Sequence, residues 1–165
     1  MNDPIVGHPM NPHFVIDSLQ LDVDEVKDFI SQVIMETYPI EDAISAILNG
    51  YSRMRLIEMF WERKWFEARD TDRNLLAVAS VYSENSLVHF SALMVKVRGI
   101  GIGSALTSKS IQWAQEANAS EITAHTHPWN IKSQNNLKKV GFEYHATLPD
   151  KWKPTGVILE FRKKL

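Results

Sequence analysis

The sequence predicts one α/β (α+β) domain in which helices cover both faces of a central sheet. Three observations carry this prediction. Apolar residues recur at helical spacing in the first third, strand-like runs separated by turns follow, and strands then alternate with helices. A meander of strands followed by such strand–helix units is typical of a sheet covered by helices on both sides. The length of 165 residues and the apolar content of 44% also suit a single globular domain.

The first third of the chain starts with prolines and continues as helices. Residues 1–12 contain three prolines, so we expect an extended or mobile arm there and one domain over residues 13–165. Asp22 and Glu25 have the spacing of a capping box, which marks the start of a helix. The elements predicted here are a strand at His13–Leu19 and helices from about Val23 to Glu36, over Ile40–Leu48 and after Ser52, the last with Leu56, Phe60 and Trp61 as its buried stripe.

From Trp65 the composition changes to short runs rich in β-branched and aromatic residues. Clusters of turn residues, TDRN and SEN, separate these runs, which predicts an antiparallel meander. A glycine-rich turn follows, and behind it strands and helices alternate. The elements predicted there are a helix over Ser104–Ala117, a strand at Glu121–Thr126, a helix over Ile131–Lys139 ended by Gly141, a strand starting at Phe142 and a C-terminal strand at Val157–Phe161.

Composition and charge exclude several classes of protein. No run approaches the roughly 18 to 20 apolar residues of a membrane span, and the N-terminus lacks the basic and apolar regions of a secretory signal. Cysteine is absent, which excludes disulfides, zinc thiolates and cysteine nucleophiles. The formal charge is −2, whereas nucleic-acid binders usually carry a basic patch or a basic balance. We therefore expect a cytoplasmic protein with no membrane or nucleic-acid partner.

Three of the seven glycines, Gly99, Gly101 and Gly103, lie within five positions. They stand between a predicted strand and a predicted helix, where glycine permits positive φ and successive amides can bind an anion. This arrangement suggests phosphate binding, with a plain tight turn as the structural alternative. The GxGxxG pattern of dinucleotide sites fails because Ser104 and Leu106 stand where its last glycine would be. The chain has no Gly-Lys pair, which excludes a nucleoside-triphosphate loop.

The glycine turn resembles a signature of the GCN5-related N-acetyltransferases. Their pyrophosphate-binding pattern, Arg/Gln-x-x-Gly-x-Gly/Ala, is met by Arg98, Gly101 and Gly103 within the stretch LMVKVRGIGIGSAL. Asn130, followed by a helix and then Lys-x-Gly-Phe, is similar to the second conserved block of the family. With two blocks at the family's usual separation, the chain is identified as a member over residues 65 to 142.

The resemblance implies the acyl-CoA N-acyltransferase fold. In this fold a mixed, mostly antiparallel central sheet is splayed between its fourth and fifth strands, and acyl-CoA lies in the wedge. Strand main chain would hold the pantetheine arm, and loop amides would hold the pyrophosphate. Acetyl-CoA is the expected acyl donor. The residues expected to bind it are Leu93 and Val95 on the strand, Arg98, Gly99, Ile100, Gly101, Ile102, Gly103 and Ser104 in the turn, and Asn130.

Transfer of an acyl group to an amine needs a base for the amine and benefits from an acid for the departing thiolate. In many family members the acid is a tyrosine seven residues after the block's Asn, but Leu137 stands there. Ser133, three residues after Asn130, is the substitute candidate; a small residue that lets the helix approach CoA is the alternative. His125 is the candidate base because it lies where some relatives place a glutamate, and imidazole titrates near neutral pH.

Further histidines and one carboxylate provide alternatives for the base. The period of a strand puts Thr123, His125 and His127 on one face, so the two histidines could act together. A His pair without a fixed third ligand falls short of a zinc site, so no metal is expected, and a purely structural histidine is the other alternative. His89 and Glu67 are weaker candidates for the base.

Together, the residues and the resemblance predict an acyl-CoA-dependent N-acyltransferase that moves acetyl from acetyl-CoA to a primary amine by direct attack. The acceptor, a small molecule or a peptide, is not marked by any motif. The alternative is a non-catalytic acyl-CoA-binding or interaction module on the same fold, which the missing tyrosine favours. The strand at Val157–Phe161 could pair between two chains in a homodimer.

Overall fold

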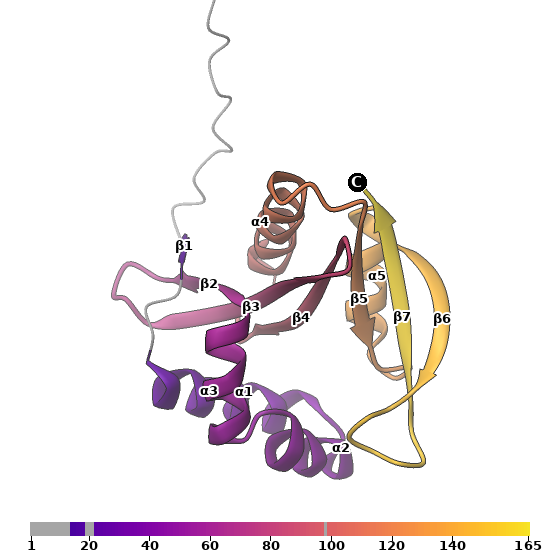
Figure 1. Ribbon diagram of the computed structural model, residues 1–165. Helices are drawn as coiled ribbons and strands as arrows, with labels where there is room; N and C mark the ends of the chain where they lie inside the picture. Colours follow the sequence, from indigo (N-terminus) through magenta and orange to yellow (C-terminus); the bar gives the residue numbers. More distant parts are fainter. Residues whose placement is uncertain (1–13, 19–21, 98) are drawn as a thin grey trace, which may run out of the picture.

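The computed structural model describes residues 14–18, 22–97 and 99–165. The expected N-terminal arm lies outside these residues, as do Arg98 and the ends of the first predicted strand, His13 and Leu19. The described chain forms one seven-stranded sheet with helices on both faces, which confirms the predicted fold class (Figure 1). None of its helices combines the length and apolar character needed to cross a membrane.

The sheet is mixed and mostly antiparallel. Its strands are β1 (Val15–Ser18), β2 (Lys64–Arg69), β3 (Leu75–Glu84), β4 (Leu87–Val95), β5 (Glu121–Thr126), β6 (Glu143–Pro149) and β7 (Val157–Lys164). They lie in the order β1-β2-β3-β4-β5-β7-β6, and β4 and β5 pair in parallel while the other recorded pairs are antiparallel. The C-terminal strand β7 is therefore inserted between β5 and β6.

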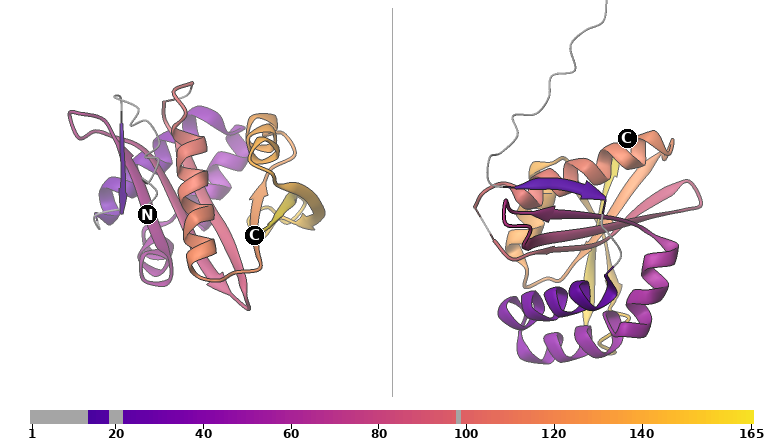
Figure 2. Two further views of the ribbon diagram at one scale, coloured as in Figure 1. Left: turned by 90° about the horizontal axis from the view of Figure 1, so that it is seen from above. Right: turned by 90° about the vertical axis from the view of Figure 1, so that its left-hand side faces the viewer.

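Helices form one layer on each face of this sheet. They are α1 (Val23–Thr37), α2 (Ile40–Ser45), the π-helix η1 (Ala46–Gly50), α3 (Arg53–Glu62), α4 (Ile102–Glu116) and α5 (Ile131–Lys139). Helices α1 to α3 cover one face, and α4 and α5 cover the other (Figures 1 and 2). Each layer buries its own apolar cluster against the sheet, with Leu106 and Leu137 on the α4–α5 side and Ile30 and Leu56 on the opposite side.

The N-terminal helices begin at the predicted caps. The Oδ1 atom of Asp22 accepts a hydrogen bond from the amide of Glu25 at 3.0 Å, at the start of α1. The Oγ atom of Ser52 accepts one from the amide of Arg55 at 3.3 Å, at the start of α3. Each cap satisfies a first-turn amide that has no partner inside its own helix, which explains why the helices start at these residues.

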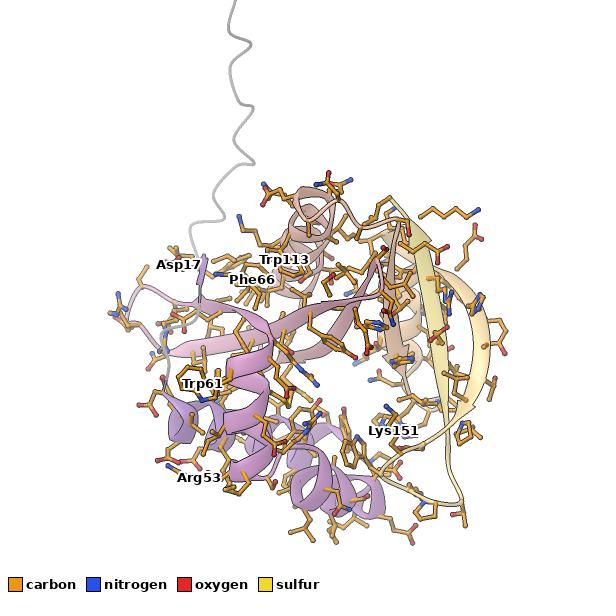
Figure 3. All side chains as sticks on the ribbon, in the orientation of Figure 1. Asp17, Arg53, Trp61, Phe66, Trp113 and Lys151 are labelled. Atoms are coloured by element: carbon orange, nitrogen blue, oxygen red, sulfur yellow. The ribbon has the colours of Figure 1, made fainter. Side chains whose placement is uncertain are left out.

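Two details of the helical layer differ from the predictions. The helix expected over Ile40–Leu48 is an α-helix only as far as Ser45 and continues as the π-helix η1 over Ala46–Gly50. The side chain of Trp61, expected in the core, is 86% exposed, and Met59 is buried in its place (Figure 3). Since a helix turns by roughly 100° per residue, Trp61 lies about 140° around α3 from the buried Leu56, which directs it toward solvent.

Candidate functional site

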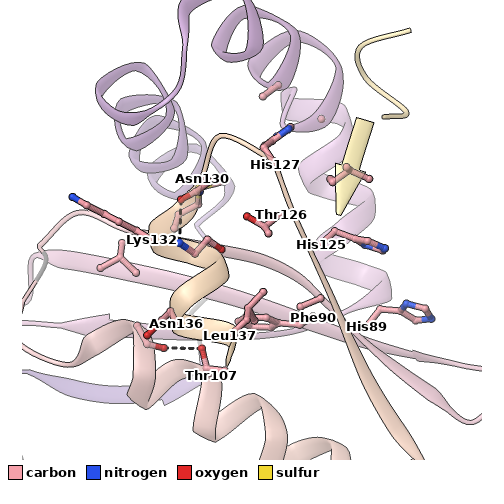
Figure 4. Close-up of a pocket in the computed structure, with 18 of the residues that line it drawn as sticks. His89, Phe90, Thr107, His125, Thr126, His127, Asn130, Lys132, Asn136 and Leu137 are labelled. Carbon is pink, nitrogen blue, oxygen red and sulfur yellow. Dashed lines mark hydrogen bonds between the residues drawn. The ribbon is translucent and has the colours of Figure 1, made fainter. Parts of the chain in front are cut away.

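A cleft of about 1190 Å³ opens where β4 and β5 separate (Figure 4). The two strands pair only over Leu87–Phe90 and Glu121–Ala124, although β4 continues to Val95 and β5 to Thr126. This confirms the predicted splay between the fourth and fifth strands. The walls of the cleft come from β3, β4, β5 and β7, from the start of α4 and the length of α5, and from the end of β6 with the loop after it. Helices η1 and α3 also contribute to the walls.

The first turn of α4 opens onto this cleft without a capping side chain. Its N-cap residue, Gly101, has no side chain that could accept a hydrogen bond from the helix. The first helical bond runs from the amide of Ala105 to the carbonyl of Gly101, at 3.0 Å, so the amides of Ile102, Gly103 and Ser104 precede it. Such amides at the positive end of a helix dipole attract an anion.

The three glycines of the turn fall into two groups, because only Gly99 and Gly101 have a positive φ. Gly99 and Gly101 have φ values of 84° and 83°, and a Cβ at either position would meet no atom within 4 Å. Backbone conformation, rather than crowding, therefore favours glycine there. A Cβ at Gly103 would lie 3.4 Å from Nδ2 of Asn136 and 3.8 Å from Cγ2 of Val95. These are ordinary van der Waals distances, so an alanine would fit at that position without crowding.

Beyond Phe90, β4 presents a free main-chain edge to the cleft. The amide of Lys96 donates to the carbonyl of Leu76, at the start of β3, at 2.9 Å. Alternate residues of a strand direct their amide and carbonyl groups to opposite edges. Leu93 and Val95 therefore direct theirs away from β3, into the gap that β5 leaves. These are the two residues whose main chain was expected to bind pantetheine.

Helix α5 starts on the same cleft but is capped. The Oδ1 atom of Asn130 accepts a hydrogen bond from the amide of Ser133 at 3.1 Å, and both residues line the cleft. The Nδ2 group of Asn130 remains as a donor. Leu137, which replaces the family's usual tyrosine, is only 5% exposed and belongs to the apolar cluster under α5. A core position at this point explains why an apolar residue fits there.

His125 and Glu160 form a hydrogen-bonded pair across β5 and β7. The two residues lie opposite each other in the strand register, with His125 Nε2 3.1 Å from Glu160 Oε2. Burial alone would raise the pKa of Glu160, but hydrogen bonds from Arg162 and His125 outweigh it and hold that pKa below its usual value. Glu160 is therefore a carboxylate at neutral pH. Because a carboxylate only accepts hydrogen bonds, Nε2 of His125 carries a proton, and Nδ1 is the basic atom of the neutral ring.

His89 lies beside this pair on β4 and is held on two sides. Its Nδ1 atom is 2.8 Å from Oγ1 of Thr123 on β5, and its ring stacks on Tyr82 with centroids 4.8 Å apart. Burial lowers the pKa of His89, which favours the neutral ring. His89 lines the cleft, but the contact with Thr123 already occupies one of its two nitrogens.

His127 has different surroundings from His125. Its ring stacks on Trp129 with centroids 5.1 Å apart, meets Tyr38 edge to face, and has Nδ1 3.7 Å from Oδ2 of Asp150. His125 instead pairs with Glu160. In the described part of the chain no three metal-ligating side chains gather in one place.

The cleft gathers most of the residues expected to form the site. Those that line it are Val95, Gly99, Gly101, Ile102, Gly103, Ser104, His125, Asn130 and Ser133. The side chain of Ile100 packs against the core, and Arg98 lies outside the described residues. Glu67, a weaker candidate for the base, is buried on β2, pairs with Arg69 at 2.9 Å and does not line the cleft. Sequence reasoning missed Glu160, because its place beside the histidine depends on strand pairing.

The sequence profile of the Acetyltransferase (GNAT) family matches residues 30–142. This range covers the glycine turn, β5 and α5, and it makes up more than half of the chain. The chain belongs to the Acetyltransferase (GNAT) family, as the two sequence blocks indicated. A search among curated protein sequences gives no match.

Solved structures of acetyltransferases share the fold. The PaiA N-acetyltransferase from Thermoplasma acidophilum, in complex with coenzyme A, has a TM-score of 0.74 at 17% identity, covering 92% of this chain and 99% of that one. An N-acetyltransferase from Staphylococcus aureus has a TM-score of 0.74 at 16% identity, covering 92% and 98%. A Bacillus subtilis acetyltransferase in complex with CoA has a TM-score of 0.71 at 17% identity, covering 92% and 99%. At these identities the likeness concerns the fold.

Proposed function

We propose that the chain is an acetyl-CoA-dependent N-acetyltransferase that acetylates a primary amine by direct attack on the thioester. The observation that carries this proposal is the meeting, in one cleft, of the uncapped first turn of α4 and the free edge of β4. Membership of the Acetyltransferase (GNAT) family and the coenzyme A complexes of two structural relatives support acetyl-CoA as the donor.

In this proposal the donor is held mainly by main chain. The pyrophosphate binds the amides at the start of α4, between Gly99 and Ser104. The pantetheine arm extends along β4 and pairs with the amide and carbonyl groups of Leu93 and Val95. Asn130 offers Nδ2 as an additional donor from α5. Pockets for small molecules and cofactors usually measure about 300–1,000 Å³, so a cleft of about 1190 Å³ has room for CoA and an acceptor.

His125 is the proposed base and Glu160 the residue that positions it. The imidazole takes a proton from the acceptor's ammonium group, and the neutral amine then attacks the carbonyl carbon of the thioester. The C–N bond forms, the C–S bond breaks, and the electron pair of the C–S bond remains on the CoA sulfur. The nitrogen then releases its second proton to the hydroxyl of Ser133, which passes its own proton to the sulfur. Glu160 fixes the ring so that Nδ1 is basic, and its negative charge stabilises the imidazolium that forms.

Ser133 is the proposed proton donor for the departing thiolate. It stands in the first turn of α5 and lines the cleft. A thiol has a reference pKa of about 8.5, so CoA leaves readily even without an acid. We therefore expect the contribution of Ser133 to be smaller than that of His125.

The proposal is tested by melting scans with acetyl-CoA and with NAD, followed by a panel of amines. A ligand at a hundred times its Kd adds about 2.7 kcal/mol to the free energy of unfolding, so acetyl-CoA should raise the Tm clearly and NAD should not. Free thiol should then appear with at least one amine. A larger shift with NAD, or none with acetyl-CoA, contradicts the proposed donor. A shift without turnover would instead favour the non-catalytic binding module.

A further inference from the structure

Two arginines stand in the wall of the cleft that faces the catalytic strands. Arg55 lies in the first turn of α3, and Arg63 follows the last residue of this helix. Both side chains line the cleft. Arg55 pairs with the exposed carboxylate of Glu58 at 2.9 Å. Arg63 forms no ion pair with any carboxylate in the described part of the chain. Its guanidinium instead lies over the ring of Tyr82, 4.8 Å from the ring centroid.

The surroundings of Arg63 leave its charge poorly compensated. Burial lowers the pKa of Arg63, and the positive charge of nearby Arg55 lowers it further. A half-buried guanidinium that faces an open cleft and another cation favours an anion from solution. The planar group also offers several N–H donors, which suit a carboxylate or a phosphate.

A continuous wall of side chains connects Arg63 to the catalytic strand. Arg63 lies over Tyr82, Tyr82 stacks on His89 at 4.8 Å, and Nδ1 of His89 meets Thr123 at 2.8 Å. Thr123 is two residues from His125 on the same face of β5. This side of the cleft therefore has a carboxylate, Glu160, next to the proposed base and a guanidinium at its far end.

From this charge arrangement we infer that the acceptor is an elongated primary amine that carries an anionic group at its far end, because neighbouring strands lie about 4.8 Å apart and Arg63 is several strands away from His125. Its ammonium lies near His125 and Glu160, and its carboxylate or phosphate binds Arg63. This inference rests on the proposed function, because it names the acceptor class for the same cleft. Arg63 is then a residue that determines acceptor specificity and takes no part in the chemical step.

The inference is tested with matched pairs of acceptors at saturating acetyl-CoA. Long-chain ω-amino acids are compared with their amides, and long-chain aminoalkyl phosphates with the corresponding amino alcohols, by the rate of thiol release. The anionic member of a pair should have a kcat/KM at least about tenfold higher, since a charge-assisted hydrogen bond is worth that much or more. The two series separate a carboxylate from a phosphate as the preferred anion.

Variants of α3 decide whether Arg63 is responsible. Arg63→Gln should remove the preference by raising KM for the anionic acceptors, with kcat and the Kd of CoA nearly unchanged. Arg53→Gln is the matched control, because Arg53 lies on the same helix, pairs with Asp24 at 2.9 Å and does not line the cleft (Figure 3). This control should keep the preference.

A binding experiment separates this inference from the proposed function. N-acetylated long-chain ω-amino acids and their amides are titrated calorimetrically into the CoA-bound protein, which requires no turnover. Tighter binding of the acids, lost in Arg63→Gln, supports the anion site even if no amine is acetylated. Equal binding of acids and amides, a preference that survives Arg63→Gln, or a weaker Kd for CoA in that variant overturns the inference and leaves the proposed function standing.

Discussion

The two helices that begin at the cleft differ in how their first turns are satisfied. At α4, Gly101 leaves the first amides without a side-chain partner, whereas at α5 the side chain of Asn130 accepts from the amide of Ser133. One helix start is open to a ligand and the other is closed by the protein. In the proposed function the same contrast extends to the two halves of the cleft, since main chain would hold the donor and side chains would select the acceptor.

This difference indicates which amino-acid substitutions each half of the cleft tolerates. A ligand held by amides and a strand edge depends on backbone shape, so only the residues that set φ matter there. The proposed acceptor half would depend on the identity of His125, Glu160 and Arg63, which come from β5, β7 and the end of α3. Substitutions should therefore affect donor binding through conformation and acceptor chemistry through functional groups.

The largest effect should come from His125→Ala in the acceptor half. General acid or base assistance is typically worth roughly 10²–10⁴-fold, so kcat/KM should fall by that factor while the Kd of acetyl-CoA stays within about twofold. In the wild type, kcat/KM should rise with pH as the base loses its proton, and His125→Ala should remove this ascending limb of the pH profile. Steady-state rates from pH 5.5 to 9 and a separate CoA titration measure both effects.

Two controls protect this prediction. Glu160→Gln should lower kcat/KM without changing the Kd of acetyl-CoA, because the ring of His125 loses the partner that positions it. The profile is repeated with an acceptor of different amine pKa. A limb that follows the acceptor and persists in His125→Ala would show that the protein supplies no base, and a loss below tenfold would make His125 a structural residue.

The donor half should respond most to Gly101→Ala. Alanine is disfavoured by roughly 1–2 kcal/mol at a φ of 83°, and relief of this strain would shift the amides of the turn, so CoA should bind about tenfold more weakly or worse. Gly141→Ala is the matched control, because Gly141 has a φ of 90° but does not line the cleft. Its new Cβ meets only the flexible end of Lys163. Calorimetry should show weaker CoA binding in Gly101→Ala alone; equal affinities would contradict a phosphate role for the turn.

A smaller effect on stability and CoA binding is expected at the capped start of α5. Asn130→Ala removes the cap and should lower the free energy of unfolding by about 1 kcal/mol. Asn130→Ser keeps a capping oxygen and removes the Nδ2 donor without adding charge, so it should retain a stability close to that of the wild type. Urea unfolding and CoA titration of both variants separate the two roles. If the Ser variant binds CoA several-fold more weakly, the Nδ2 group contacts the donor.

The smallest effect concerns His89 and pH. Burial holds the pKa of folded His89 below the ordinary value of 6.5, so as the pH falls below 6.5 the unfolded chain takes up a proton that the folded chain does not. Stability is therefore lost as the pH decreases through this range. His89→Gln should lose less stability than wild type between pH 7 and pH 5. The lowered pKa of Glu160 affects stability only below about pH 4.5 and leaves this comparison intact. Identical losses in urea unfolding would refute the assignment.

Local signals explain what could be predicted from the sequence. The structure gives β5 and α5 the predicted bounds, because the turn residues and caps around them act over a few positions. The open start of α4 was visible for the same reason, since glycines report backbone shape directly. The partner of His125 could not be predicted, because Glu160 lies 35 positions away and only the register of β5 with β7 brings it close. Arg63 likewise gains a role only when α3 packs across from β4.

The insertion of β7 between β5 and β6 has a consequence for the order of folding. During synthesis β5 and β6 leave the ribosome before β7, yet β7 is the strand that joins them. Until β7 arrives, the edge of β5 lacks its neighbour and His125 lacks Glu160. The N-terminal strands, with α1 to α4, can pack early through the hairpin contacts of the meander. A nascent chain would therefore acquire the surface for the donor first and become competent for chemistry only when its last strand closes the sheet.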